Sequence, residues 1–263
     1  MLRPLAIGAL PLPSNLFLAP MAGITDLPVR LLARRFGAAL CFTEMVSVNG
    51  LVREGRKSFD LVRSLPDDRP LGIQIFGDDP ELMAEGAALV AGHGDLIDIN
   101  MGCPVRKVVG SGAGSALLRD PLRVAAIIRA VRRRVALPLS VKIRSGWQAG
   151  DENYRDIAAI ADYEAVVSLD RRNVKAYMGI GEARYNLGNF KEAIDNFKDA
   201  QKLDPNNAEI YEYLMLSYLG DNDIKNVRKT FEKYRKMVSE DQLAQMNTQE
   251  KYRLLMQVVT TGN

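Results

Sequence analysis

Residues 97–107 read IDINMGCPVRK. The apolar residues before Asn100 predict a buried β-strand, because short apolar runs bounded by turn residues are typical of strands in parallel sheets. Gly102 and Pro104 predict a turn, and Cys103 lies between them. The stretch therefore places a thiol at the open end of a strand, and the rest of the chain decides whether other functional groups accompany it.

Five short apolar runs recur through the first part of the chain. They are LFLA (16–19), LCFTE (40–44), LGIQIF (71–76), LIDIN (96–100) and LSVKIR (139–144). Segments of helical period lie between them at 26–35, 80–91 and 121–134, and Pro80 and Pro121 each follow an Asp placed to cap a helix. This alternation predicts about five βα units with a parallel sheet, which corresponds to an incomplete (β/α)8, or TIM, barrel.

Polar or reactive side chains follow the ends of all five predicted strands. They are Met21, Glu44, Gln74, Asn100 with Cys103, and Lys142 with Arg144. In a (β/α)8 barrel the carboxyl ends of the strands form the face on which active sites are built. Any single one of these residues is equally compatible with a solvated loop, but five strands in succession favour a common site.

The residue composition changes near residue 161. The first 161 residues hold 17 Arg and 3 Lys, whereas the remaining residues hold 6 Arg and 9 Lys. Tyrosine changes in the same way, from 1 residue to 8. Because folding has little reason to prefer Lys to Arg so abruptly, the bias indicates two segments of different origin. We expect two domains, 1–161 and 162–263, joined naturally or artificially.

The second segment has a helical repeat. Residues 173–205, NVKAYMGIGEARYNLGNFKEAIDNFKDAQKLDP, resemble a tetratricopeptide repeat, and a looser copy follows with Tyr211, Leu214, Val227 and Phe231 at the same offsets. This resemblance predicts an array of antiparallel helix pairs whose groove binds a protein or peptide partner. The α/β barrel is thus expected to be followed by an all-α array.

The join between the two segments is itself expected to be helical. Apolar residues at Ile157, Ile160, Val166 and Leu169 predict one amphipathic helix that passes through residue 161. This helix would replace the missing half of a preceding repeat.

The amino-acid composition indicates which class of protein the chain belongs to. A chain of 263 residues that is 47% hydrophobic predicts a globular protein with a real core, and no apolar run approaches the roughly 18 residues that a membrane helix needs. The N-terminal segment is interrupted by Pro4, Pro11 and Pro13, so we interpret it as mature protein and not as a signal peptide. Two cysteines do not form a disulfide framework, which predicts a cytoplasmic location. The net charge of +3 permits a polyanionic partner without requiring one.

Five motifs of the first segment closely resemble the tRNA-dihydrouridine synthases. They are LAPMAGITDLPVR (18–30), TEMVSVNGL (43–51), QIFGDDPELMAEGA (74–87), DINMGCPVRKVVGSGAGSALLRDP (98–121) and VKIRSGW (141–147). The resemblance covers residues 1–161 in the order and spacing of the family. It implies a flavoenzyme that uses FMN, with NADPH as reductant, to reduce uridine to 5,6-dihydrouridine in tRNA.

The resemblance also implies roles for individual residues. Cys103 corresponds to the proton donor, a role that suits a thiol because it is mostly protonated at neutral pH. Asn100 corresponds to a residue that contacts the uracil edge, and Arg144 is assigned to the substrate with it. The implied flavin contacts are Gln74, Lys142 and the turn formed by Pro20, Met21 and Ala22.

The segment that follows the cysteine matches a mobile loop of the family. Arg106 and Lys107 lie there, followed by the glycine-rich GSGAGS (110–115), and the family loop closes on the RNA. Cys41 is expected to be a core residue and His93 to lie in a solvated loop. No His, Cys or carboxylate pair has metal-ligand spacing, so no metal is predicted.

The resemblance stops after VKIRSGW. The family barrel continues with three more strands, a second flavin-contacting histidine, the turns that hold the flavin phosphate, and a tRNA-binding helical domain, none of which this chain matches. Turnover by this chain is therefore not expected. The alternative is that the tetratricopeptide segment is the working part, a scaffold that binds a protein partner while the half-barrel is inert.

Overall fold

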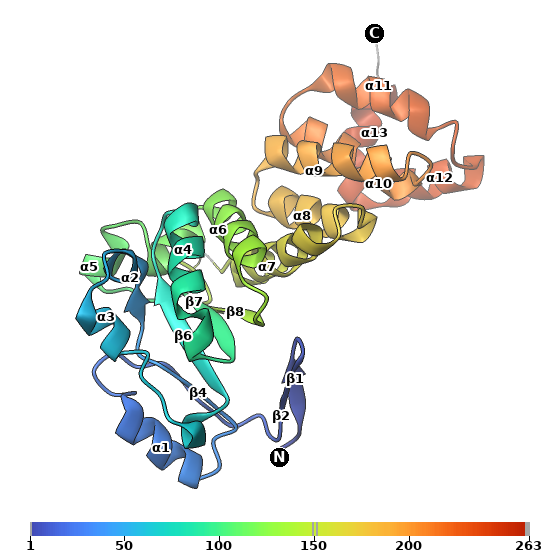
Figure 1. Cartoon of the computed structure of the whole chain (residues 1–263). Helices are drawn as coiled ribbons and strands as arrows, with labels where there is room; N and C mark the ends of the chain where they lie inside the picture. The colour runs from blue at the N-terminus through green and yellow to red at the C-terminus, as the bar shows by residue number, and fades with distance from the viewer. Residues whose placement is uncertain (1, 149, 151, 261–263) are drawn as a thin grey trace. The chain divides into compact units, whose positions relative to one another are not determined.

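The computed structural model describes residues 2–148, 150 and 152–260. The chain folds into two compact units, of which the first ends at Tyr154 and the second begins at Arg155 (Figure 1). Residue 161, where the composition changes, lies inside the continuous helix α7 (Tyr154–Leu169).

A parallel sheet forms the centre of the first unit. Its strands are β3 (Phe17–Leu18), β4 (Leu40–Phe42), β6 (Leu71–Phe76), β7 (Leu96–Met101) and β8 (Leu139–Ile143), in that spatial order. A short strand, β5 (Val46–Ser47), also pairs with β6. The five predicted strands are confirmed, and because neighbours in sequence are neighbours in the sheet, the order is that of a partial (β/α)8 barrel.

Three longer helices connect these strands, and each begins at an aspartate. They are α1 (Leu27–Arg35), α4 (Pro80–Val90) and α6 (Pro121–Arg134). The side chains of Asp26, Asp79 and Asp120 accept hydrogen bonds from the backbone N–H three residues later, at 3.1, 2.9 and 3.0 Å. These contacts satisfy N–H groups that the first turn leaves without partners, so the predicted capping is confirmed.

Shorter elements complete the first unit, and a β-hairpin among them was not predicted. The short helices are α2 (Val48–Val52), α3 (Arg56–Asp60), η1 (Pro66–Asp68), η2 (Ala91–His93), α5 (Arg106–Val109) and η3 (Gly114–Arg119). The hairpin pairs β1 (Leu5–Ile7) with β2 (Leu10–Leu12). Its Leu12 packs into a cluster with Leu40, Phe42 and Leu96, so the hairpin covers apolar side chains of the sheet.

The two faces of the sheet differ in polarity. Ile73, Ile75, Ile97 and Ile99 are fully buried and alternate along β6 and β7 with the polar Gln74, Asp98 and Asn100. Successive side chains of a strand point to opposite faces, so the polar residues share the face that forms the interior of a closed barrel.

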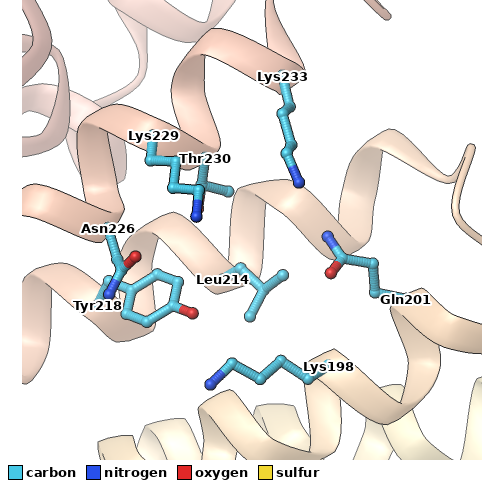
Figure 2. Close-up of a pocket in the computed structure, with 8 residues that line it drawn as sticks. All are labelled: Lys198, Gln201, Leu214, Tyr218, Asn226, Lys229, Thr230 and Lys233. Carbon is cyan, nitrogen blue, oxygen red and sulfur yellow. The ribbon is translucent and has the colours of Figure 1, made fainter.

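The second unit contains two helix pairs that repeat at a constant interval along the sequence. The first pair is α8 (Val174–Asn186) and α9 (Phe190–Leu203), and the second is α10 (Ala208–Gly220) and α11 (Ile224–Tyr234). A polar pocket lies between α9, α10 and α11 (Figure 2). Gly181 permits close packing within the first pair, because a Cβ at this position would lie 2.6 Å from the Phe197 ring. The predicted all-α array is confirmed.

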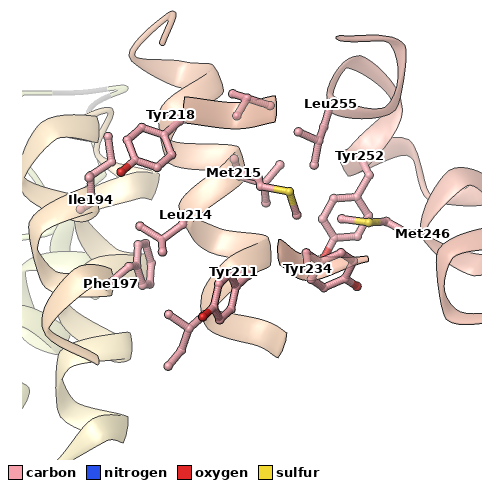
Figure 3. Packing of buried hydrophobic residues seen from close by; sticks show 14 of the residues in the cluster. Ile194, Phe197, Tyr211, Leu214, Met215, Tyr218, Tyr234, Met246, Tyr252 and Leu255 are labelled. Atoms are coloured by element: carbon pink, nitrogen blue, oxygen red, sulfur yellow. The ribbon is translucent and has the colours of Figure 1, made fainter. Parts of the chain in front are cut away.

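One hydrophobic core runs through the second unit (Figure 3). It contains Phe197, Leu214 and Met215 from the repeats, and it extends into α12 (Glu240–Thr248), η4 (Glu250–Tyr252) and α13 (Arg253–Thr260). Inside this core Glu212 accepts hydrogen bonds from the hydroxyls of Tyr234, at 2.7 Å, and Tyr252. Burial, reinforced by Glu212, raises the pKa of both phenols.

Helix α7 is continuous, as predicted, but its buried face differs from the predicted one. Ile157 and Ile160 are buried, whereas Val166 and Leu169 are exposed. The buried face continues instead through Ala161 and Glu164. Glu164 is held at 3.3 Å by Arg184, which also donates to Asn196 at 2.6 Å, so the buried face of α7 ends in an ion pair and not in apolar contacts. Within the described residues, no helix combines the length and apolarity that a membrane span requires.

Candidate functional site

The register of three strands sets polar residues side by side. Gln74 on β6 pairs with Asp98 on β7, Asp98 pairs with Ser140 on β8, and Asn100 pairs with Lys142. Gln74, Asn100 and Lys142 were predicted from the sequence to belong to the site. Asp98 and Ser140 were not, although a charged residue inside the apolar run LIDIN was a visible signal.

A directed chain of hydrogen bonds connects these residues to the cysteine turn. Gln74 Nε2 donates to Asp98 Oδ2 at 2.6 Å, and Asn100 Nδ2 donates to Gln74 Oε1 at 2.9 Å. Asn100 Oδ1 in turn accepts from the backbone N–H of Cys103 at 2.9 Å and of Gly102 at 3.2 Å. A backbone N–H can only donate and a carboxylate can only accept, so the two ends fix the orientation of both amides. We call this chain of contacts the amide relay.

Asp98 is the buried end of the amide relay. It is 3% exposed, and burial raises its pKa to about 6, although hydrogen bonds from Gln74 and Ser140 and the charge of Lys142 favour the ionised form. Ser140 Oγ donates to Asp98 Oδ1 at 2.6 Å. Both carboxylate oxygens therefore have partners, which a buried charge requires.

Cys103 lies where β7 ends, with its thiol free and partly exposed. Its carbonyl accepts a hydrogen bond from the N–H of Ser115 at 3.0 Å. Gly114 has a φ of +62°, and a Cβ there would lie 2.6 Å from the Cys103 carbonyl oxygen. The glycine-rich segment therefore packs directly against the cysteine, and it needs Gly114 for both conformation and space.

The loop after β3 forms the tight turn that is predicted from the sequence to contact the flavin. Pro20, Met21 and Ala22 lie in it, and the Met21 carbonyl accepts from the N–H of Ile24 at 3.1 Å and of Thr25 at 3.0 Å. Glu44, at the end of β4, accepts a hydrogen bond from the N–H of Gly23. Two neighbouring loops are thus joined at the carboxyl ends of their strands.

A cavity of about 300 Å³ opens on the polar face of the sheet. Phe17, Phe42 and Val141 are among its apolar walls, and Asp98, Ser140 and Lys142 supply its polar lining. Pro20 and Lys142 are the predicted flavin contacts that line it, whereas Gln74, Met21 and Ala22 lie outside the lining. Apolar walls beside the Lys142 ammonium suit a flat ring such as that of FMN, whose reduced form carries negative charge, whereas Asp98 adds a carboxylate to the same lining.

The remaining predicted residues lie around this site or away from it. Arg144 is exposed one residue beyond β8, and Arg106 and Lys107 are exposed on α5. Cys41 is fully buried, as expected, and burial raises the pKa of its thiol. His93 is exposed at the end of η2. No cluster of three His, Cys, Asp or Glu side chains suited to a metal ion occurs among the residues that the structure describes.

Comparison with known proteins identifies two families. The dihydrouridine synthase (Dus) family model matches residues 17–166, and the tetratricopeptide repeat model matches residues 174–207. A solved structure titled MamA MSR-1 C2 aligns with 72% of this chain and 88% of its own, but at 17% identity and a TM-score of 0.31, which is too low to indicate a shared fold.

Curated relatives match the same part of the chain. tRNA-dihydrouridine synthase B of Pseudomonas aeruginosa is 41% identical over 191 residues, which is 72% of this chain and 58% of the relative. A probable tRNA-dihydrouridine synthase of Rhizobium leguminosarum bv. phaseoli is 43% identical over 154 residues, or 58% of this chain and 48% of the relative. The chain thus spans about half of the length of the relatives that it matches. Since the family model covers more than half of this chain and its cysteine motif, the chain belongs to the dihydrouridine synthase family.

Proposed function

We propose that the first unit carries the uridine-reducing site of a tRNA-dihydrouridine synthase. The observation that supports this proposal best is the amide relay, which connects the backbone of Cys103, just after β7, to Asp98 in the lining of the cavity. Reduction of the C5–C6 bond of uracil requires a hydride at one carbon and a proton at the other. When bound, FMN would supply the hydride, with NADPH as the proposed reductant.

The residues of this chain would do the remaining work. Cys103 would donate the proton to the uracil ring. Lys142 and Pro20 would contact the flavin from the cavity wall, where the ammonium of Lys142 offsets the negative charge of a reduced ring. Asn100 and Gln74 hold one another in the structure, so their proposed contacts to uracil and flavin would use hydrogen-bonding capacity that the amide relay leaves open.

The proposed macromolecular partners differ between the units. Exposed cations lie near the carboxyl ends of the strands, at Arg106, Lys107 and Arg144, where they would contact tRNA phosphates. The tetratricopeptide helices would bind a protein partner. We also propose that the segments of different origin meet near residue 161, within α7.

Visible absorption of the purified chain, with and without added FMN, tests the proposal. If the chain binds FMN, we expect one flavin per chain. If the loaded chain also reduces uridine in tRNA, Cys103→Ala should abolish turnover while the flavin remains bound. Lys142→Met should instead weaken FMN binding. A chain that remains colourless and binds no FMN would refute the enzymatic proposal for this polypeptide and leave partner binding by the helical unit as the surviving function.

A further inference from the structure

The polar pocket of the second unit offers a binding site separate from the barrel. It lies between α9 and α11, which are the second helices of the two repeats, and α10 forms its floor (Figure 2). Its volume is about 170 Å³, which suits one side chain and not a large ligand. Every residue that lines it belongs to the second unit, so the pocket is complete without the first unit.

Three lysines converge on this pocket from two helices. Lys198 comes from α9, and Lys229 and Lys233 lie four residues apart on α11, hence on one face of that helix. Within the described residues, none of the three forms an ion pair. Other cations nearby do, since Lys202 pairs with Asp199 at 2.8 Å and Arg235 pairs with Glu232 at 2.9 Å. The charge of the pocket lysines is therefore left for a ligand.

A further carboxylate close to this group, Asp223, is already engaged. Asp223 caps α11 and accepts hydrogen bonds from Asn226, from the backbone N–H at 3.1 Å and from Nδ2 at 2.6 Å. These hydrogen bonds lower the pKa of Asp223, and the charge of Lys198 also acts on it and helps to lower its pKa. Asp223 is absent from the pocket lining, however, and the lysines are the charged residues of that lining among those that the structure describes.

Neutral donors and an apolar floor complete the pocket. The side chains of Tyr218, Gln201, Thr230 and Asn226 line it together with the lysines, and Leu214 lies beneath them (Figure 2). The Nδ2 group of Asn226 is already bonded to Asp223, so the neutral donors come from the other three. A carboxylate accepts hydrogen bonds and donates none, so it matches a ring of ammonium, hydroxyl and amide donors. The methylene groups of a glutamate would pack on Leu214.

The same lining disfavours nucleic acid. Arginine, whose planar guanidinium binds phosphate through two hydrogen bonds, is absent from the described lining. Proteins that bind single-stranded nucleic acid stack bases on exposed aromatic rings. Tyr218 is only 9% exposed, with the Lys198 ammonium 5.8 Å from its ring centroid, so its ring face is not free for a base.

We propose that this pocket binds an acidic segment of a partner protein, with one glutamate or aspartate side chain inserted between the lysines of α9 and α11. Further acidic residues of the segment would lie along Lys229 and Lys233 on the rim. The site is independent of flavin chemistry, so it stands whether or not the first unit reduces uridine.

Fluorescence anisotropy on the full chain tests this site with a short fluorescein-labelled peptide of Glu and Gly. We expect saturable binding that weakens with added NaCl, because salt screens exposed charges. The triple variant Lys198→Gln, Lys229→Gln, Lys233→Gln should bind about tenfold more weakly or worse. The matched control Lys175→Gln, Lys191→Gln, Lys236→Gln removes the same charge from exposed lysines outside the pocket and should stay within about twofold of the wild type.

Several outcomes would overturn the assignment. They are absence of saturable binding, equal affinity for a Gln and Gly peptide of the same length, and equal losses in the pocket and control variants. A polyuridylate oligonucleotide that bound through the same three lysines more tightly than the acidic peptide would also overturn the assignment, since the pocket would then be a nucleic-acid-binding site. Circular dichroism checks the fold of each variant. If the triple variant is unfolded, the single variant Lys233→Gln, which changes an exposed side chain, replaces it in the binding measurement.

Discussion

Asp98 illustrates how one buried carboxylate organises several residues of the candidate site. It accepts from Gln74 and Ser140, and through Gln74 it fixes which atom of Asn100 faces the cysteine turn. Without an acceptor at position 98, the Gln74 Nε2 group loses its partner, and the amide relay is held only from the end that contacts the cysteine turn. The position of the Cys103 backbone therefore depends on a side chain that does not touch it.

Replacement of Asp98 by alanine should loosen the cysteine turn. We expect Asp98→Ala to cost about 1–3 kcal/mol of stability, because the Gln74 amide is left buried without its partner. Alkylation of Cys103 by iodoacetamide, followed by peptide mass spectrometry, should become faster, with the fully buried Cys41 as internal control. Asp98→Asn retains an oxygen for Gln74 and an NH₂ for Ser140, so the alkylation rate of its Cys103 should match that of the wild type. Equal alkylation rates in all three proteins would contradict the amide relay.

The pKa of Asp98 predicts a pH dependence with a definite sign. Burial raises the pKa from 3.8 to about 6, so the folded protein binds this proton more tightly than the unfolded chain. The contribution of this proton to the free energy of unfolding is fully present below pH 4. It is lost as the pH rises from about 4 to 6, which lowers the stability by roughly 3 kcal/mol. The free energy of unfolding of Asp98→Asn should therefore rise relative to the wild type over this range. Urea unfolding followed by Trp147, the single tryptophan, measures the difference, and a constant difference would refute the assignment.

Among the elements of the first unit, α1 depends on a buried ion pair for its attachment. Arg30 Nη2 lies 2.8 Å from Asp68 Oδ2, and both side chains are almost fully buried. Arg30 also donates to the carbonyls of Thr25 and Arg63, each at 2.8 Å. The pair thus connects α1 to η1 and to the loop before it.

Loss of one partner should be costly at this position. We expect Asp68→Ala to lower the free energy of unfolding by about 3–5 kcal/mol, because the guanidinium of Arg30 would remain buried without its counter-charge. The adjacent Asp67 is exposed, so Asp67→Ala controls for the removal of a carboxylate from the same turn. Urea unfolding by Trp147 fluorescence compares the two, and equal small losses would show that the pair does not hold α1.

At the scale of the whole molecule, each unit has a hydrophobic core of its own. Leu40, Phe42 and Leu96 pack together in the first unit, and Phe197, Leu214 and Met215 in the second. Separate cores predict separate cooperative transitions. Trp147 fluorescence reports the first unit, whereas far-ultraviolet circular dichroism reports the helices of both units, so the two unfolding curves should have different midpoints. A single coincident transition would contradict this prediction.

The sequence by itself determined the five main strands, the long helices and the family. The apolar runs, the aspartate and proline pairs at helix starts and the spacing of the tetratricopeptide motif all act within a few turns of the chain, so local periodicity reveals them. The prediction of an incomplete barrel followed by a helical array is confirmed on this basis. The site roles of Cys103, Asn100 and Lys142 remain predictions from resemblance.

The tertiary structure decided which side chains meet. That Gln74 lies opposite Asp98, and Asp98 opposite Ser140, depends on strand register, which packing of the whole sheet sets and which no local pattern encodes. Three further features could not be predicted from the sequence for the same reason. They are the hairpin β1–β2, the ion pair of Glu164 on α7, and the lysines that converge from α9 and α11. Each of these joins residues far apart in the chain, where burial and pairing, and not local propensity, determine the outcome.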